Sequence, residues 1–465
     1  MPALTALALF VVWATGQAGY PVTHWGAGGL IVLGLFGVCV GVVGLRAADV
    51  PTPVRIALGC LAGYTALSYL SILWAAVPGD AWEGANRTLL YLLVFALFAC
   101  WRQRGDSAVL LLGAWTLAMI ALAAFAVLHV QAASATGLDQ LLPGGRLVYP
   151  SGYANANAAQ WLMAFWPALL LARSSRLPWA LRGLLAGGAV LLAEVALLSL
   201  SRGSLYATPV MLVLVFALLP GRTRTFALLV PVAAGVGAAA PAVLRVGEDR
   251  VTPAVINSAT AAMLLSALAV ALVVALACAI ESRRAFSETS LRRMRRGVGV
   301  VAIATLLAVL VGGWVAAGDP VARVRHGWDT FKGGYAANTT GGGRLTSGLG
   351  SNRYDFYRVA LDEFAAHPLL GIGADNFQQA YLAHGRSSET PRYPHSVELR
   401  TLTETGLAGA LLALAGLGSA LVAGWRALRG PDALGAAVAA AALSGFAYWA
   451  VHGSCLLYTS PSPRD

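Results

Sequence analysis

Long apolar runs separated by short polar segments dominate the sequence, and they leave few alternatives for its fold. A run of roughly 20 apolar residues can cross the hydrocarbon core of a bilayer as a helix. Only 11% of the residues are charged and the mean hydropathy is +0.70, whereas about a quarter of the residues in soluble proteins are charged. We therefore predict an all-α polytopic membrane protein.

Counting the runs gives about 13 transmembrane helices. We expect about 11 of them within residues 1–317, then a large and mostly helical extracytoplasmic loop domain over 318–394, and the last two transmembrane helices over 395–454. Residues 455–465 resemble translated vector sequence, so we expect a non-native tail there. The runs lie at about 3–14, 25–45, 54–76, 86–101, 107–129, 156–172, 181–199, 204–219, 225–243, 256–280, 298–317, 396–425 and 432–452.

Arginine residues collect in alternate segments between these runs, for example at Arg102 and Arg104 and between Arg283 and Arg296. Cytoplasmic loops of membrane proteins carry an excess of basic residues. We therefore predict a cytoplasmic N-terminus, with the long polar interval before Pro394 on the outer side of the membrane.

The composition and the missing motifs disfavour several functions. The net charge is +11, but the basic residues are dispersed along the chain, so we expect no nucleic-acid partner. The sequence has no Asp-x-Asp, no P-loop and no metal-spaced His/Cys cluster. We therefore expect neither a metal nor a cofactor, and we disfavour ATP-driven transport and metal-assisted transfer from nucleotide sugars.

A histidine stands where the long polar interval meets an apolar run, in YPHSVELRTLTETGLAGA. A helix starting near Pro394 would place His395, Glu398 and Gly406 roughly on one face. The positive end of the helix dipole would keep His395 neutral, as a general base requires, and Gly406 and Gly409 would let a second helix approach. Alternatively, His395 only caps or anchors a transmembrane helix.

Arginines on the predicted outer side oppose the usual charge distribution, and guanidinium groups bind phosphate oxygens well. They are therefore candidates for binding a lipid phosphate, although each could instead form a surface ion pair or contact a lipid headgroup. These residues are Arg87, Arg146, Arg202, Arg344, Arg353, Arg358 and Arg392.

Arg202 is the most confined of these cations, because SLSRGSLY is a very short connection between two apolar runs. Ionisable residues near a membrane interior are costly and usually functional. Glu194 lies about two helical turns deeper; it could support Arg202 through water or a polar group, or be satisfied by Ser and Thr neighbours.

Two further segments carry polar side chains that could meet substrate. In RLVYPSGYANANAAQW, Asn155 or Asn157 could cap the following helix or could face a sugar or diphosphate. The segment 353–366 has helical periodicity and could lie along the membrane surface as an amphipathic helix.

These motifs together resemble the O-antigen ligase and polymerase superfamily. His395-Ser396, nine residues, Gly406, two residues and Gly409 match its signature. YPSGYANANAAQ, SRGS and NRYDFYRVALDEFAAHPLLGIGADNF, in this order, are similar to other stretches of the same family. The resemblance extends over about residues 146–409.

The resemblance implies a metal-independent, inverting glycosyltransferase of the bacterial inner membrane. It would transfer a glycan from undecaprenyl diphosphate to a hydroxyl of lipid A core, a growing polysaccharide or a protein on the outer face. His395 would be the general base, and Arg202 and Arg353 would bind the diphosphate. Arg146, Arg358 and Arg392 are weaker candidates for the same anion.

Two other functions remain open from the residues alone. A transporter of a small anion or a lipid-linked sugar would have charged groups near the bilayer midplane and inverted repeats, but the sequence has only Glu194 there and no visible repeat. An envelope-assembly scaffold would not depend on His395 or Arg202.

Overall fold

The computed structural model describes residues 2–45, 49–101, 104–248, 251–283, 319–333 and 352–455, together with 293, 296–297, 299–301, 304 and 307. Every regular element within these ranges is a helix, so the predicted all-α class is confirmed. The chain divides into two compact units. The first consists of Met1–Trp115, Val148–Asn157 and Asn352–Asp465, and the second of Thr116–Leu147 and Ala158–Ser351.

Eight of the described helices are long and apolar enough to cross a membrane. The predicted total of about 13 is not confirmed, because the other predicted runs fall on shorter or less apolar helices and 298–317 lies almost entirely outside the described residues. The predicted tail likewise falls outside them, apart from Cys455 at the end of the last helix. The candidate spans are Val22–Val43, Thr52–Leu73, Gly105–Gln131, Trp179–Leu198, Arg222–Glu248, Pro253–Arg283, Val397–Leu428 and Ala433–Ser454.

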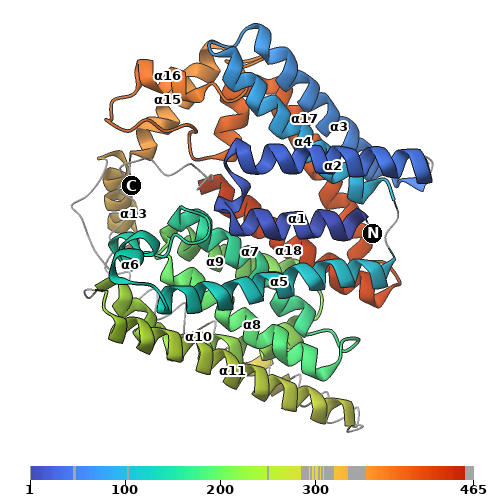
Figure 1. Ribbon diagram of the computed structural model, residues 1–465, viewed down its shortest axis with the longest axis vertical. Helices are drawn as coiled ribbons and strands as arrows, with labels where there is room; N and C mark the ends of the chain where they lie inside the picture. Colours follow the sequence, from blue (N-terminus) through green and yellow to red (C-terminus); the bar gives the residue numbers. More distant parts are fainter. Residues whose placement is uncertain are drawn as a thin grey trace. The chain divides into compact units, whose positions relative to one another are not determined.

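The first unit is built around α17, which packs against α3 and α18, while α4 packs against α3 and α2. Figure 1 shows α3 and α4 in blue running beside the orange-red α17. The helices of the first unit are α1 (Pro2–Thr15), α2 (Val22–Val43), α3 (Thr52–Leu70), α4 (Pro78–Ala99), α15 (Arg353–Ala366), α16 (Phe377–His384), α17 (Val397–Leu428) and α18 (Ala433–Cys455).

The polar helices of this unit have their own apolar core. Phe356 and Val359 of α15 are enclosed together with Phe377 and Tyr381 of α16. The segment 353–366 is therefore a helix as predicted, but its apolar side packs inside the protein rather than on a membrane surface. Sequence periodicity could not make this distinction, because either environment favours the same apolar stripe.

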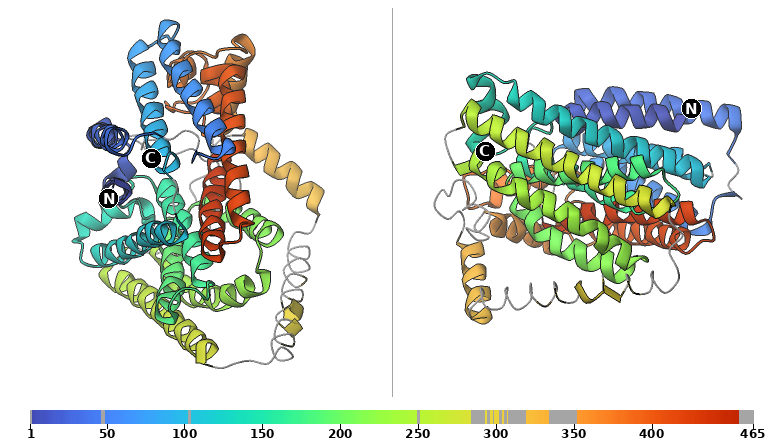
Figure 2. Two further views of the ribbon diagram at one scale, coloured as in Figure 1. Left: turned by 90° about the vertical axis from the view of Figure 1, so that its right-hand side faces the viewer. Right: turned by 90° about the horizontal axis from the view of Figure 1, so that it is seen from below.

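The second unit is built around α8. This helix is the most enclosed of the candidate spans, because 78% of the residues in its most apolar stretch are buried. The helices α10 and α11 pack against α8 and against each other (Figures 1 and 2). Gly187 permits the close approach of α8 and α11, because a Cβ atom there would overlap the backbone of Ala267. The helices of this unit are α6 (Ala135–Leu141), α8 (Trp179–Leu198), α9 (Arg202–Leu218), α10 (Arg222–Glu248), α11 (Pro253–Arg283) and α13 (Pro320–Lys332), while α5 (Gly105–Gln131) and α7 (Ala154–Ala172) have residues in both units.

Helix α17 begins later than predicted and is broken in its first half. Ser396 is its N-cap and accepts a hydrogen bond from the backbone N–H of Leu399 at 3.3 Å. His395 therefore precedes the helix, with φ +61°, and does not share a helical face with Glu398 and Gly406. The break lies at Gly406, where φ is +61° and ψ is −161°.

A loop from the polar interval fills this break. The N–H groups of Leu407 and Ala408 donate to the carbonyls of Pro368 and Leu369 at 2.8 and 3.1 Å. In return, the N–H of Ile372 donates to the carbonyl of Thr403 at 2.9 Å. The glycine thus admits a loop backbone rather than the second helix that we expected, because a Cβ atom at Gly406 would overlap Leu369.

Candidate functional site

The His395 side chain is half-buried against α15. Its ring stacks on that of Phe356, with centroids 5.4 Å apart and planes at 22°. The Nδ1 atom is enclosed and has no hydrogen-bond partner among the described residues. No group in the described part of the chain therefore fixes the tautomer through Nδ1, and the ring is oriented by stacking and by the backbone.

The surroundings of His395 keep the imidazole neutral. Burial lowers the pKa of His395, and the positive charge of Arg353 lowers it further, to about 3. The predicted neutral histidine is thus present, but the predicted cause is wrong, since the ring lies outside the first turn of α17. Burial and a neighbouring cation, rather than the helix dipole, keep the imidazole neutral.

Arg353 is the first residue of α15 and makes no ion pair within the described part of the chain. Arg358, one turn later, is engaged instead: its guanidinium group pairs with Asp355 at 2.9 Å and with Asp362 at 3.1 Å. It also donates to the carbonyl of His384 at 2.6 Å. Arg353 therefore offers a cation next to His395, whereas Arg358 joins α15 to the end of α16.

Glu398 connects the start of α17 with the end of α18. Its carboxylate accepts hydrogen bonds from the hydroxyls of Ser396 at 2.8 Å and of Ser454 at 2.6 Å. His452, one turn before the end of α18, is buried and stacks on Tyr448, with centroids 5.6 Å apart. The chain around His395 is therefore braced by α15 and α18.

Asn155 and Asn157 do not cap their helix. Helix α7 begins at Ala154, so both lie inside its first turn. The amide nitrogen of Asn155 donates to the Tyr153 hydroxyl at 2.7 Å, and Asn157 is completely buried.

In the second unit, Arg146 lies against the short turn that carries Arg202. The backbone N–H of Leu147 donates to the carbonyl of Leu198 at 3.1 Å, and Nε of Arg146 donates to the carbonyl of Ser199 at 3.4 Å. Arg202 begins α9 directly after this turn and is half-buried. The structure thus brings two of the predicted phosphate-binding arginines to one end of α8.

Glu194 is completely buried in α8, where one carboxylate oxygen accepts a hydrogen bond from the Ser266 hydroxyl of α11 at 2.6 Å. The serine satisfies one oxygen of Glu194, and the other oxygen has no hydrogen-bond partner among the described residues. The residue joins two helices of the second unit.

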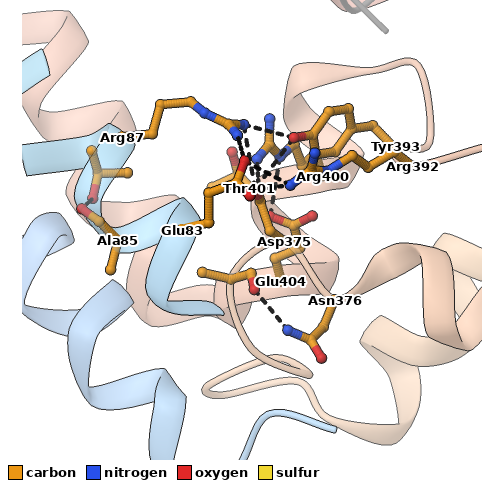
Figure 3. A network of polar contacts seen from close by, with 12 residues as sticks. Glu83, Ala85, Arg87, Asp375, Asn376, Arg392, Tyr393, Arg400, Thr401 and Glu404 are labelled. Atoms are coloured by element: carbon orange, nitrogen blue, oxygen red, sulfur yellow. Dashed lines mark hydrogen bonds and ion pairs between the residues drawn. The ribbon is translucent and has the colours of Figure 1, made fainter. Parts of the chain in front are cut away.

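An ionic network in the first unit was not recognised in the sequence (Figure 3). It contains three guanidinium groups and three carboxylates, from residues far apart in the chain. Charge type alone could not identify it, because only the fold brings α4, the loop 371–376 and α17 together. Its charged members are Glu83, Arg87, Asp375, Arg392, Arg400 and Glu404.

These helices and polar groups define a multi-span helical membrane protein with a neutral histidine beside a cation, next to the start of a membrane helix. We compared the sequence with models of known protein families. Residues 251–414 match the family model described as O-antigen ligase. The match confirms the predicted resemblance to the O-antigen ligase and polymerase superfamily over this part of the chain.

The matched region contains Arg353, His395 and Gly406, whereas Arg146 and Arg202 lie before it. The match supports a membrane enzyme that transfers glycans, and with the apolar helices it indicates a bacterial inner membrane protein. A search of curated proteins found no match to the chain.

The structure also explains the spacing of the signature. The nine residues between Ser396 and Gly406 are Val397–Thr405, the helical segment from the N-cap of α17 to its break. A longer or shorter segment would turn the break away from the loop that fills it, since each residue rotates a helix by about 100°. The interval between histidine and glycine is therefore set by helix geometry.

Proposed function

We propose that the protein transfers a glycan from undecaprenyl diphosphate to an acceptor hydroxyl, with His395 as the general base. The observation that carries the proposal is the neutral, half-buried imidazole of His395 beside the Arg353 cation, within the matched domain. The active site would lie on the outer face of the inner membrane. The acceptor is lipid A core, a growing polysaccharide or a protein.

In the proposed reaction, the acceptor oxygen forms a bond to the anomeric carbon of the donor sugar. His395 takes the hydroxyl proton, and the bond from that carbon to the diphosphate oxygen breaks. Attack opposite the leaving group inverts the anomeric carbon. The lipid diphosphate leaves with its electron pair, and guanidinium groups stabilise its charge without a metal.

Arg353 is the best-supported diphosphate ligand, because it lies beside His395 and makes no ion pair within the described residues. Arg202 and Arg146, which lie together at one end of α8, are proposed as diphosphate ligands on the basis of the SRGS motif. Arg358 would have to exchange its carboxylate partners for phosphate. Arg392 stays paired with Glu83 and Asp375 and is not proposed as a ligand.

Donor binding would also adjust the base. A diphosphate next to Arg353 offsets the positive charge that opposes protonation of His395, so the pKa of His395 rises when the donor binds. A general base works best when its pKa lies near the working pH. The donor would thereby help to activate the histidine.

The test reconstitutes the chain with undecaprenyl-diphosphate glycan and crude envelope acceptors and follows release of lipid diphosphate. We expect His395→Ala to lower the rate by about 100-fold or more and Arg353→Ala or Arg202→Ala by about 100-fold. His384→Ala is the matched control, because its ring is 62% exposed and pairs only with Glu363 among the described residues.

Acceptor-dependent release that is lost in the His395 and Arg353 variants supports the transferase. Full activity of His395→Ala would show that the proposed site is wrong. If labelled glycan crosses the bilayer without release of lipid diphosphate, the protein is a transporter.

A further inference from the structure

The carboxylate of Asp375 is completely buried and is surrounded by cations (Figure 3). Its oxygens pair with the guanidinium groups of Arg87 at 3.3 Å and of Arg392 at 3.5 Å, and with that of Arg400. The hydroxyl of Tyr393 donates a further hydrogen bond at 3.3 Å. Burial alone would raise the pKa of Asp375, but Arg400, Arg87 and Arg392 hold it below its ordinary value, so the group is ionised.

The partners of Asp375 flank His395 in the chain. Arg392 and Tyr393 stand directly before it, and Arg400 lies five residues after it on the first turns of α17. The Arg400 guanidinium also lies over the Tyr393 ring, 3.8 Å from its centroid. A single carboxylate therefore holds both sides of the segment that presents His395.

This segment needs external support. The φ angle of +61° places His395 in the left-handed region, which residues other than glycine occupy at a cost. Such a conformation persists when neighbouring contacts determine it. Phe356 supports the ring from one side, and the contacts of Asp375 hold the backbone on both sides of the residue.

Asp375 is itself fixed by the loop 371–376. The amide of Asn376 accepts from the N–H of Val77 at 2.7 Å, and the Ser71 hydroxyl accepts from the N–H of Ala374 at 3.0 Å. The Trp74 indole donates to the carbonyl of Gly371 at 3.2 Å. The loop is thereby joined to the corner between α3 and α4 as well as to the break in α17.

Helix α4 makes room for the Asp375 side chain. A Cβ atom at Gly84 would lie 3.0 Å from Cγ of Asp375 and 3.3 Å from its Oδ1. Glycine is otherwise unfavourable inside a helix. The close approach of the carboxylate explains why this position, buried in α4, has no side chain.

We propose that Asp375 is a positioning residue, which holds His395 in its reactive orientation through Arg392, Tyr393 and Arg400. The inference rests on the proposed role of His395 as the base. It predicts a loss in kcat with an unchanged KM for the donor, because Asp375 is enclosed and would not touch the substrate. If Asp375 had a purely structural role, its replacement would change the amount of folded protein but would not lower kcat at constant KM.

The experiment measures kcat and KM of purified, reconstituted Asp375→Asn, which keeps the size of the side chain and removes its charge. We expect kcat to fall about 100-fold, the effect of a reacting group displaced by about 1 Å, with donor KM within about threefold of the parent. Asp375→Asn combined with His395→Ala should be no slower than His395→Ala alone, because the base has already been removed.

Gly84→Ala disturbs the Asp375 side chain without removing its charge. This variant tests the positioning role of Asp375 if Asp375→Asn does not fold. We expect its kcat to fall about tenfold, as a smaller displacement would cause. The matched control is Gly79→Ala in the same helix, since a Cβ atom there meets no neighbour; its kcat should equal that of the parent.

Folded Asp375→Asn and Gly84→Ala proteins with the kcat of the parent, alongside an inactive His395→Ala, would overturn the inference and leave the proposed function intact. A raised KM with unchanged kcat would overturn it as well, because Asp375 would then act on binding. Full activity of His395→Ala would instead refute the proposed function.

Discussion

The imidazole of His395 shows how the surroundings of a residue can matter more than its place in the sequence. The ring is neutral because it is enclosed and because Arg353 lies near it. Its backbone adopts a left-handed conformation outside α17, so the helix dipole is not needed to explain its charge state. The following predictions test this electrostatic account.

The ratio kcat/KM for the donor should stay nearly constant as the pH is lowered from 8 to 5. The base acts in its neutral form, and with a pKa of about 3 in the free protein His395 remains neutral over this range. Measuring kcat/KM for the donor against pH tests this, because that ratio reports on the free enzyme. A twofold loss near pH 6.5, where an ordinary histidine is half protonated, would contradict it.

Replacing Arg353 by glutamine should have two separate effects. Removing the cation raises the pKa of His395, so the acid limb of kcat/KM moves upward in pH. Loss of a charged hydrogen bond to the diphosphate should also lower kcat/KM, by about tenfold or more. Arg353→Lys, which keeps the charge, should retain the pH profile of the parent while losing part of the affinity.

At the scale of elements, α17 combines a membrane helix with a backbone break that a loop completes. The broken turn leaves backbone N–H and carbonyl groups without partners inside the helix. Such groups are costly when they stay unpaired in a protein interior. The loop 368–373 pairs with them on both sides of the break. Loop and helix therefore depend on each other for stability.

Gly406→Ala should destabilise this arrangement. The φ and ψ angles of Gly406 belong to a region used almost only by glycine, so alanine costs about 1–3 kcal/mol before any overlap with Leu369 is counted. Gly418→Ala in the same helix is the control, because a Cβ atom there meets no neighbour and alanine should stabilise the helix by about 0.5–1 kcal/mol.

Thermal unfolding of the two proteins in lipid nanodiscs provides the comparison. The Gly406 variant should unfold at a lower temperature than the parent, and the Gly418 variant at the same or a higher temperature. Equal midpoints for Gly406→Ala and the parent would mean that the break is not required.

At the scale of the whole molecule, the chain combines two helical units whose polar groups differ in kind. The first contains His395, Arg353 and the network around Asp375. The second contains Arg146, Arg202 and the buried pair of Glu194 and Ser266.

The alternation of basic loops predicts the orientation of the second unit. Ser175, between α7 and α8, should face the cytoplasm, and Ala135, at the start of α6, should face outward. Both residues are exposed, so each can be replaced by cysteine in a chain whose own cysteines have been removed. A membrane-impermeant maleimide applied to intact cells should label Ala135→Cys and leave Ser175→Cys unlabelled until the membrane is opened; the reverse pattern would invert the proposed topology.

The all-α class, the membrane character and the positions of most helices could be predicted from the residues alone, because these features depend on local periodicity and on the length of apolar runs. The sequence also predicted the resemblance to the O-antigen ligase and polymerase superfamily, because His395, Gly406 and Gly409 stand at the spacing of its signature. The same local information could not show that α17 breaks, since an isolated glycine is also compatible with close helix packing.

The support of the candidate site depends on contacts that form only when the chain folds. The network joins Glu83 and Arg87 of α4 to Asp375 and to Arg400 of α17. Arg87 and Arg392 stand out in the sequence only as cations on the predicted outer side. Hydrophobic periodicity gives no information about their distant carboxylate partners. Folding buries them together, and burial strengthens their electrostatic interactions by excluding water. The same exclusion of water, with the nearby charge of Arg353, keeps His395 neutral.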